Sequence, residues 1–165
     1  MKPPPEKPPE PAQDWSQVED RWQFRTRKVA SHILPGSSVI DLGAGAQGLR
    51  YLLPYGSTYT AADLFSRSPD TIVFDADSDD WPEGRWDVAV MAGLLEHCVR
   101  QEHVIDRACR LAPTVICTYS HDDRLRQSKN LTDGQLIRMF RRRGFEVEKF
   151  PLGYGRWWLY RCTTS

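Results

Sequence analysis

The residues best suited to chemistry in this sequence lie in a glycine-rich turn, VIDLGAGAQG, from Val39 to Gly48. Its glycines follow the G-x-G-x-x-G spacing, which lets a backbone approach a nucleotide closely. One carboxylate, Asp41, stands two residues before the first glycine, where a dinucleotide would place its pyrophosphate. Two negative groups at one turn repel each other. The turn therefore favours a ligand whose amino-acid part carries an ammonium and a sulfonium over NAD.

Three further motifs follow at the ends of later apolar runs. Asp63 closes the second run and can accept hydrogen bonds from both hydroxyls of a ribose, a role that NAD enzymes also use. The third run ends in FDAD (residues 74–77), where a carboxylate and the neighbouring backbone can bind an adenine amino group. The fourth run ends in MAGLLEH (residues 91–97), a turn of small residues that can lie against a methionine portion.

Alternating strands and helices must position these motifs. Patterning predicts strands at 38–42, 58–64, 71–74, 86–91, 114–119, 145–150 and 156–162, and helices at 47–53, 102–111 and 132–143. A first helix begins at a capping box formed by Ser16 and Glu19 and ends before Pro35. Helix-length crossovers are typical of parallel strands, whereas only about five residues join the last two strands. The sequence thus predicts a three-layer α/β sandwich with a mostly parallel seven-stranded sheet and a C-terminal antiparallel hairpin. Ligands of such sheets bind beyond the carboxyl ends of the strands, where all four motifs fall.

Composition narrows the class of protein. The chain has 165 residues, enough for one domain, and 22 basic residues balance 22 acidic ones, which argues against general affinity for nucleic acid or an anionic membrane. The sequence contains neither a membrane-spanning stretch nor a secretory signal, and its four cysteines lack metal-ligand spacing, so we expect a cytoplasmic protein without a metal site.

Six of the twelve prolines lie in the first eleven residues. This pattern predicts a disordered tail at 1–13, or a docking peptide for a protein partner, followed by one domain at 14–165. The oligomeric state is left open, a homodimer included.

The order of these motifs resembles that of the class I, Rossmann-like, S-adenosylmethionine-dependent methyltransferases. The similarity is greatest to the compact bacterial branch with an LEH signature, and it extends from Trp22 to Cys162. The third glycine departs from the pattern, because many members carry it one place earlier, where this chain has Gln47. The resemblance implies S-adenosylmethionine as cofactor, with the methionine side at Asp41 and the turn, the ribose at Asp63 and the adenine at 75–77. The implied cofactor-binding residues are Asp41, Gly43, Ala44, Gly45, Gly48, Asp63, Leu64, Asp75, Ala76, Asp77, Met91, Ala92, Gly93 and His97.

A catalytic base is needed only if the acceptor loses its proton during attack. His121, with Asp122 beside it after the fifth predicted strand, is the candidate pair. The alternative interpretation of these residues is an exposed turn with a capping aspartate. No N/D-P-P-Y and no proline–cysteine pair follows the fourth strand, which disfavours amide-like nitrogens and cytosine C5 as acceptors. We expect a hydroxyl or amine of a small metabolite, sugar or natural-product intermediate, or a carrier-bound acceptor.

Two other functions remain open from the sequence. The stretch 120–131 is short and polar and offers little cover for a substrate, so the chain could be a methyltransferase-like binding or scaffold module. An NAD-binding domain is the second alternative, although the chain has no residues left for a separate substrate region.

Overall fold

A computed structural model describes residues 19–121, 131–153 and 155–165 of the chain. Within these residues seven strands form one sheet, in the order β3-β2-β1-β4-β5-β7-β6. The strands are β1 (Ser38–Leu42), β2 (Thr58–Asp63), β3 (Ile72–Val73), β4 (Val88–Ala92), β5 (Thr114–Ser120), β6 (Phe145–Pro151) and β7 (Trp157–Thr164). The first five strands are parallel, and β7 runs antiparallel to both β5 and β6. The predicted fold class, with its C-terminal antiparallel hairpin, is confirmed.

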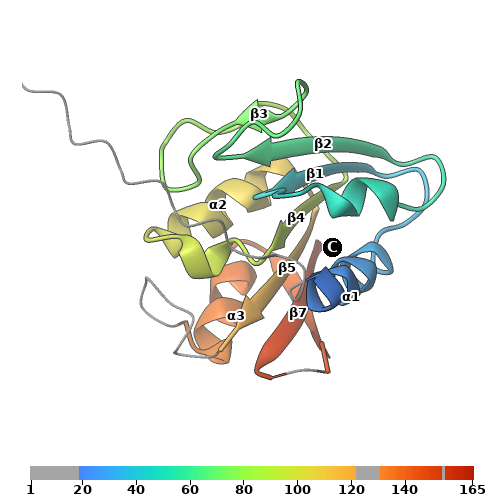
Figure 1. Cartoon of the computed structure of the whole chain (residues 1–165). Helices are drawn as coiled ribbons and strands as arrows, with labels where there is room; N and C mark the ends of the chain where they lie inside the picture. Colours follow the sequence, from blue (N-terminus) through green and yellow to red (C-terminus); the bar gives the residue numbers. More distant parts are fainter. Residues whose placement is uncertain (1–18, 122–130, 154) are drawn as a thin grey trace, which may run out of the picture.

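Helices cover both faces of this sheet. The helix α1 (Glu19–Ala30) packs on one face, over a core that includes Val39, Val90 and Leu159. The helices α2 (Gln101–Leu111) and α3 (Asp133–Arg141) cover the other face (Figure 1). Because side chains alternate along a strand, Asp41 points to the same face as Val39, which is the α1 face.

The first half of the sheet carries less helix than the sequence predicts. The predicted helix at 47–53 is wrong: the structure has a single 3-10 turn there, η2 (Gly48–Tyr51). Residues 43–87, all of which the structure describes, contain no α-helix. The connections beyond β1, β2 and β3 are therefore loops that lie at the carboxyl ends of these strands.

The last helix follows its sequence signals closely. Thr132 caps α3, because its hydroxyl accepts from the Gln135 amide at 3.2 Å and the Gln135 side chain accepts from the Thr132 amide at 2.9 Å. The helix ends before Gly144, which has a φ of 83°. No helix in the described part of the chain is long and apolar enough to cross a membrane.

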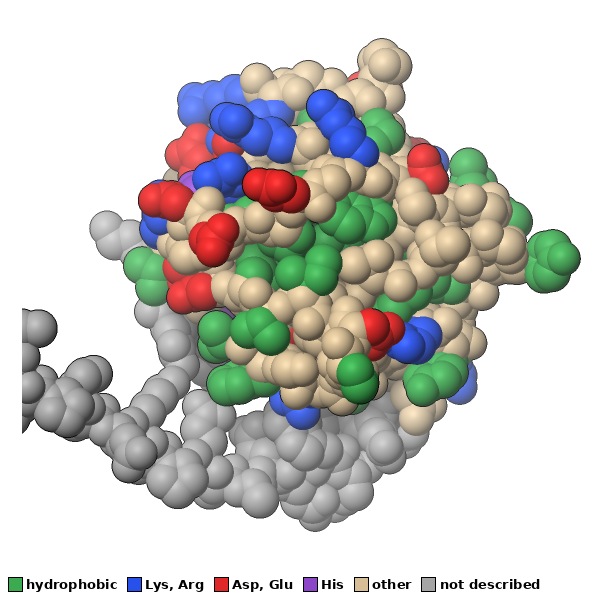
Figure 2. Space-filling model, turned by 90° about the horizontal axis from the view of Figure 1, so that it is seen from above, with side chains coloured by type: hydrophobic (Ala, Val, Ile, Leu, Met, Phe, Trp, Pro, Cys, Tyr) green, Lys and Arg blue, Asp and Glu red, His purple; other side chains and the backbone are tan. Residues whose placement is uncertain are grey.

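Most of the acidic side chains near β2 and β3 lie at or just after the carboxyl ends of these two strands. These residues are Asp63, Asp75, Asp77, Asp79 and Asp80. Figure 2 looks down on the β3 side and shows acidic side chains gathered at the left, the direction in which β2 points in Figure 1. The sheet therefore presents an acidic edge where the sequence predicts a ligand site.

Candidate functional site

The glycine turn and the end of β2 are joined by direct hydrogen bonds. The Gly45 amide donates to Asp63 Oδ2 at 2.7 Å, and the Phe65 amide donates to Asp63 Oδ1 at 3.0 Å. The Gly43 amide donates to the Ala62 carbonyl at 2.8 Å. The two motifs, which the sequence assigns to one ligand, are thus joined directly, and Asp63 is held in place by the backbone of the glycine turn.

Gln47 takes a left-handed backbone conformation that usually favours glycine. Its φ of 59° makes it the sole non-glycine residue at positive φ among those described. Its buried carboxamide donates to Ser68 Oγ at 2.9 Å and to Thr71 Oγ1 at 3.0 Å. Gly48 has no positive φ, and a Cβ there would meet nothing within 4 Å. Of Gln47 and Gly48, it is therefore Gln47 that takes the left-handed conformation, and its side chain also joins the turn to the loop after β2 by hydrogen bonds.

Asp41 is a buried carboxyl beneath α1. Its exposed fraction is 5%, and Oδ2 accepts a hydrogen bond from the Tyr59 hydroxyl at 2.8 Å. Burial raises its pKa from 3.8 to about 6, while the Tyr59 hydrogen bond and the positive charge of Arg25 act in the opposite direction. Near neutral pH this side chain is a negative charge held at the end of β1.

Arg25 reaches the same place from α1, and the sequence analysis did not identify it. Its guanidinium lies 5.4 Å from the ring centre of Trp22 and 5.5 Å from that of Trp157. It also covers Gly93, where a Cβ would stand 2.6 Å from Arg25 Nη1. The Trp22–Arg25 spacing of one helical turn, just before the glycine turn, is the signal that could have found it.

The turn after β4 packs against the first glycine of the glycine turn. Leu94 packs on Gly43, where a Cβ would lie 3.0 Å from Leu94 Cδ1. Ala92 is partly buried against the α1-side core, whereas Met91 is buried in the core on the α2 side, so only its backbone can face a ligand at this edge. His97, in the 3-10 turn η3 (Leu95–His97), is exposed.

The two carboxylates of FDAD have different tasks. Asp77 accepts from the Arg100 amide at 2.7 Å and the Val99 amide at 3.0 Å, so it caps the start of α2. Asp75 stays exposed, and its Oδ1 accepts from the Asp77 amide at 2.9 Å. Trp81 Nε1 donates to the Ala76 carbonyl at 3.2 Å and buttresses the turn. Of the two acids, Asp75 is the one placed to meet a ligand.

His121 lies on the α2–α3 face, and its ring packs 5.1 Å from that of Tyr119. Its Nδ1 is 3.1 Å from the Leu131 carbonyl, which can only accept a hydrogen bond. Its Nε2 is 2.8 Å from the Tyr160 hydroxyl, which donates its own proton to Asp133 at 2.6 Å. Both ring nitrogens thus face acceptors, which favours the protonated ring, the wrong form for a base. Asp122 lies outside the described residues.

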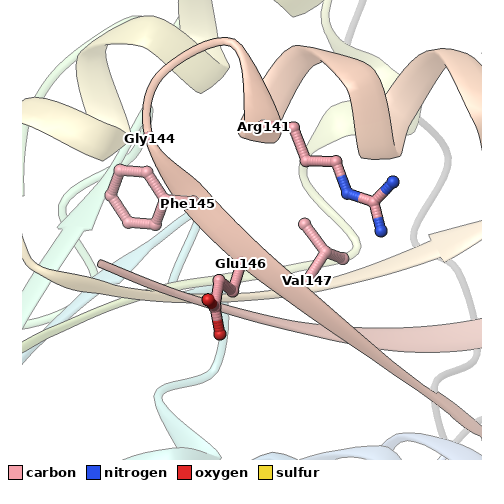
Figure 3. Close-up of a pocket in the computed structure, with 5 residues that line it drawn as sticks. All are labelled: Arg141, Gly144, Phe145, Glu146 and Val147. Atoms are coloured by element: carbon pink, nitrogen blue, oxygen red, sulfur yellow. The ribbon is translucent and has the colours of Figure 1, made fainter. Parts of the chain in front are cut away.

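A surface hollow of about 510 Å³ is not part of this site (Figure 3). It is lined by Arg141, Gly144, Phe145, Glu146 and Val147. Glu146 is in register with Thr163, which also pairs with Thr114, the first residue of β5. The hollow therefore lies at the amino ends of the parallel strands, opposite the glycine turn.

Comparison with known proteins agrees with this geometry. The profile of the methyltransferase domain family matches residues 15–150. No curated protein sequence matches the chain. Among solved structures, magnesium protoporphyrin IX methyltransferase from Synechocystis with bound SAM has a TM-score of 0.74 at 15% identity, over 95% of this chain and 87% of that one.

Two further solved structures share the fold. The 1,6-didemethyltoxoflavin-N1-methyltransferase of Burkholderia thailandensis, with bound S-adenosylhomocysteine, has a TM-score of 0.65 at 19% identity over 91% of this chain and 82% of that one. A TehB-like SAM-dependent methyltransferase from Corynebacterium glutamicum has a TM-score of 0.66 at 17% identity over 90% and 97% of the two chains. These identities support the fold alone, whereas the family profile spans most of the sequence. The chain belongs to the methyltransferase domain family, whose methyl donor is S-adenosylmethionine.

Proposed function

We propose that this chain binds S-adenosylmethionine at the carboxyl edge of its sheet and transfers the methyl group to a hydroxyl or amine of a small or carrier-bound metabolite. It would stand with the compact bacterial members that carry an LEH signature. The observation that carries the proposal is a row of three carboxylates, Asp41, Asp63 and Asp75, at the ends of the adjacent strands β1, β2 and β3 around one glycine turn.

Each carboxylate suits one part of the donor. Asp63 uses both oxygens to hold backbone amides, yet each carboxylate oxygen has a second lone pair that can accept from a ribose hydroxyl. Asp75 is exposed and can accept from the adenine amino group. Asp41, negative near neutral pH, is suited to the methionine ammonium. A Cβ at Gly45 would meet nothing within 4 Å, so the turn leaves room for a ligand beside its backbone.

The bound donor supplies a reactive methyl group on a sulfonium, so positioning can provide much of the rate. The residues around the turn bind and orient the donor, and Leu94 packs against Gly43, the first glycine of the turn. An amine acceptor that arrives neutral needs no base on the enzyme. For a hydroxyl acceptor His121 remains the proposed base, but it would first have to lose a proton and one of its two contacts.

Calorimetry on the full chain tests the proposal with S-adenosylmethionine, S-adenosylhomocysteine and NAD. Asp63→Asn should weaken S-adenosylhomocysteine binding by about 1–3 kcal/mol, because charged ribose contacts are lost. Glu146→Gln, which makes the same charge change at the opposite end of the sheet, should leave the affinity unchanged. Binding of NAD without S-adenosylmethionine would refute the proposal, and binding of none of the three would favour a scaffold.

A further inference from the structure

One buried side chain joins the glycine turn to the loop between β2 and β3. We infer that this residue, Gln47, is a positioning residue for the methyl donor, because it fixes the two backbone segments that hold the carboxylate of Asp63. The inference rests on the proposed function, in which Asp63 binds the ribose. It adds a residue that acts through Asp63 and not through a contact of its own with the ligand.

The carboxylate of Asp63 is held from two sides. Its Oδ2 accepts a hydrogen bond at 2.7 Å from the amide of Gly45, which belongs to the glycine turn. Its Oδ1 accepts at 3.0 Å from the amide of Phe65, which belongs to the loop after β2. The direction of the carboxylate therefore depends on the distance between the turn and the loop, since a change in that distance would move an oxygen away from its donor.

Gln47 sets this distance. It lies two residues after Gly45, and its Nε2 donates to Ser68 Oγ at 2.9 Å and to Thr71 Oγ1 at 3.0 Å. The residue is only 7% exposed, so water competes little for these hydrogen bonds. The contacts complete a closed ring, which leads from the turn to the loop through Gln47 and back to the turn through Asp63.

The loop residues that receive Gln47 are themselves fixed. Thr71 Oγ1 also accepts from the Ser68 amide at 3.2 Å, and Ser68 Oγ donates to Asp70 Oδ1 at 2.5 Å. The other oxygen of Asp70 accepts from Arg50, in η2, at 2.7 Å. This second link is a partly exposed ion pair, and such pairs stabilise little by themselves. The buried carboxamide is therefore the main connection between turn and loop.

The backbone of Gln47 points to the same role. Its φ of 59° is a left-handed conformation that strains any residue with a Cβ. A glycine at this position would remove the strain, but it would have no side chain to reach the loop. Strained residues persist where the surrounding structure holds them, and they are concentrated at functional sites. Here the strain coincides with the one side chain that connects the turn to Ser68 and Thr71.

Calorimetry with S-adenosylhomocysteine on the full chain tests the inference. Gln47→Gly removes the side chain without backbone strain and should weaken binding by about fivefold or more, while circular dichroism shows a folded chain. Gln47→Asn tolerates the same φ and keeps a carboxamide, but it is one carbon shorter and should show the same loss. Ser68→Ala/Thr71→Val removes both acceptors and should weaken binding by a similar factor. Adding Gln47→Gly to that variant should cause no further loss.

The Asp63→Asn background separates positioning from a general structural role. If Gln47 acts through Asp63, adding Gln47→Gly to Asp63→Asn should weaken binding by less than about twofold. An equal loss in both backgrounds would overturn the inference, and so would normal binding by folded Gln47→Gly.

Tyr51→Ala, at an exposed position of the same 3-10 turn, is the matched control and should bind normally. If the unmodified chain does not bind S-adenosylhomocysteine, the proposed function itself fails. If the unmodified chain binds it and the only one of these variants with weaker binding is Asp63→Asn, the proposed function stands and the inference alone is refuted.

Discussion

Replacing Asp41 by asparagine should stabilise the protein at neutral pH while weakening its cofactor site. Asp41 is buried, and its carboxyl has a pKa of about 6 instead of 3.8. Asparagine has the shape of the protonated carboxyl and can still accept the hydrogen bond from Tyr59. The substitution therefore removes the titration with little change in packing.

The sign and size of the effect follow from proton linkage. Between pH 3.8 and about 6 the folded chain holds a proton on Asp41 that the unfolded chain has lost. The free energy of unfolding therefore falls as pH rises through this window, and it stays lower above it. A shift of about two pKa units corresponds to about 3 kcal/mol. The Asp41→Asn variant has no such titration, so its free energy of unfolding relative to the unmodified chain should rise by about 2.5 kcal/mol from pH 4 to pH 8.

Urea unfolding of the variant and of the unmodified chain at pH 4 and pH 8 measures the difference between their free energies of unfolding. The other titrating groups are the same in both chains, so their contributions cancel in this difference. Asp87→Asn is the control with the opposite sign. Asp87 is exposed, and hydrogen bonds from the Ser38 amide and hydroxyl, at 2.7 and 2.8 Å, lower its pKa. Its replacement should destabilise the protein more at pH 8 than at pH 4. A stability difference between Asp41→Asn and the unmodified chain that does not change with pH would refute the reasoning.

The remaining predictions concern the ligand, the turn and the histidine network. Because Asp41 must be ionised to meet an ammonium, S-adenosylhomocysteine affinity should fall about tenfold from pH 7 to pH 5; calorimetry should find no such change in Asp41→Asn. Gln47→Ala should unfold more easily in urea than Gln47→Gly by about 1 kcal/mol, because only glycine tolerates the φ of 59° without strain, and equal stabilities would contradict this account. Tyr160→Phe should cost about 1–3 kcal/mol of stability by leaving the ring of His121 and the carboxylate of Asp133 without their bridge. If Tyr160→Phe lost methyl transfer but kept its stability, the hydrogen-bond network of Tyr160, His121 and Asp133 would have a role in catalysis instead of in folding.

Local signals in the sequence were sufficient for the strands and for α3. Buried parallel strands are short apolar runs, and the few residues between the last two runs leave room only for an antiparallel hairpin. Thr132 and Gly144 mark the limits of α3 through capping chemistry that depends on near neighbours alone. The predicted helix at 47–53 failed because a short apolar pattern carries no information about the space between β1 and β2.

The sequence also predicted the positions of the motifs, but it did not predict which of their side chains form structural contacts and which remain available to a ligand. Asp75 and Asp77 are equivalent in the string FDAD, and only the start of α2 distinguishes them by taking the carboxylate of Asp77. His121 has the type and place of a base, yet contacts with Leu131 and Tyr160 favour its protonated form. Such contacts join residues that are far apart in the chain, so spacing cannot reveal them.

The sequence by itself determined the positions of the strands along the chain, the glycine turn and the acids that end β1, β2 and β3, because each is encoded within a few residues. Only the tertiary structure decided which residues share a site. Packing of α1 on β4 brings Arg25 against Gly93, and the loop after β2 lets Gln47 hold a left-handed position with two side-chain hydrogen bonds. The physical reason is that charge, burial and hydrogen bonding act through space, and folding sets which neighbours each group has.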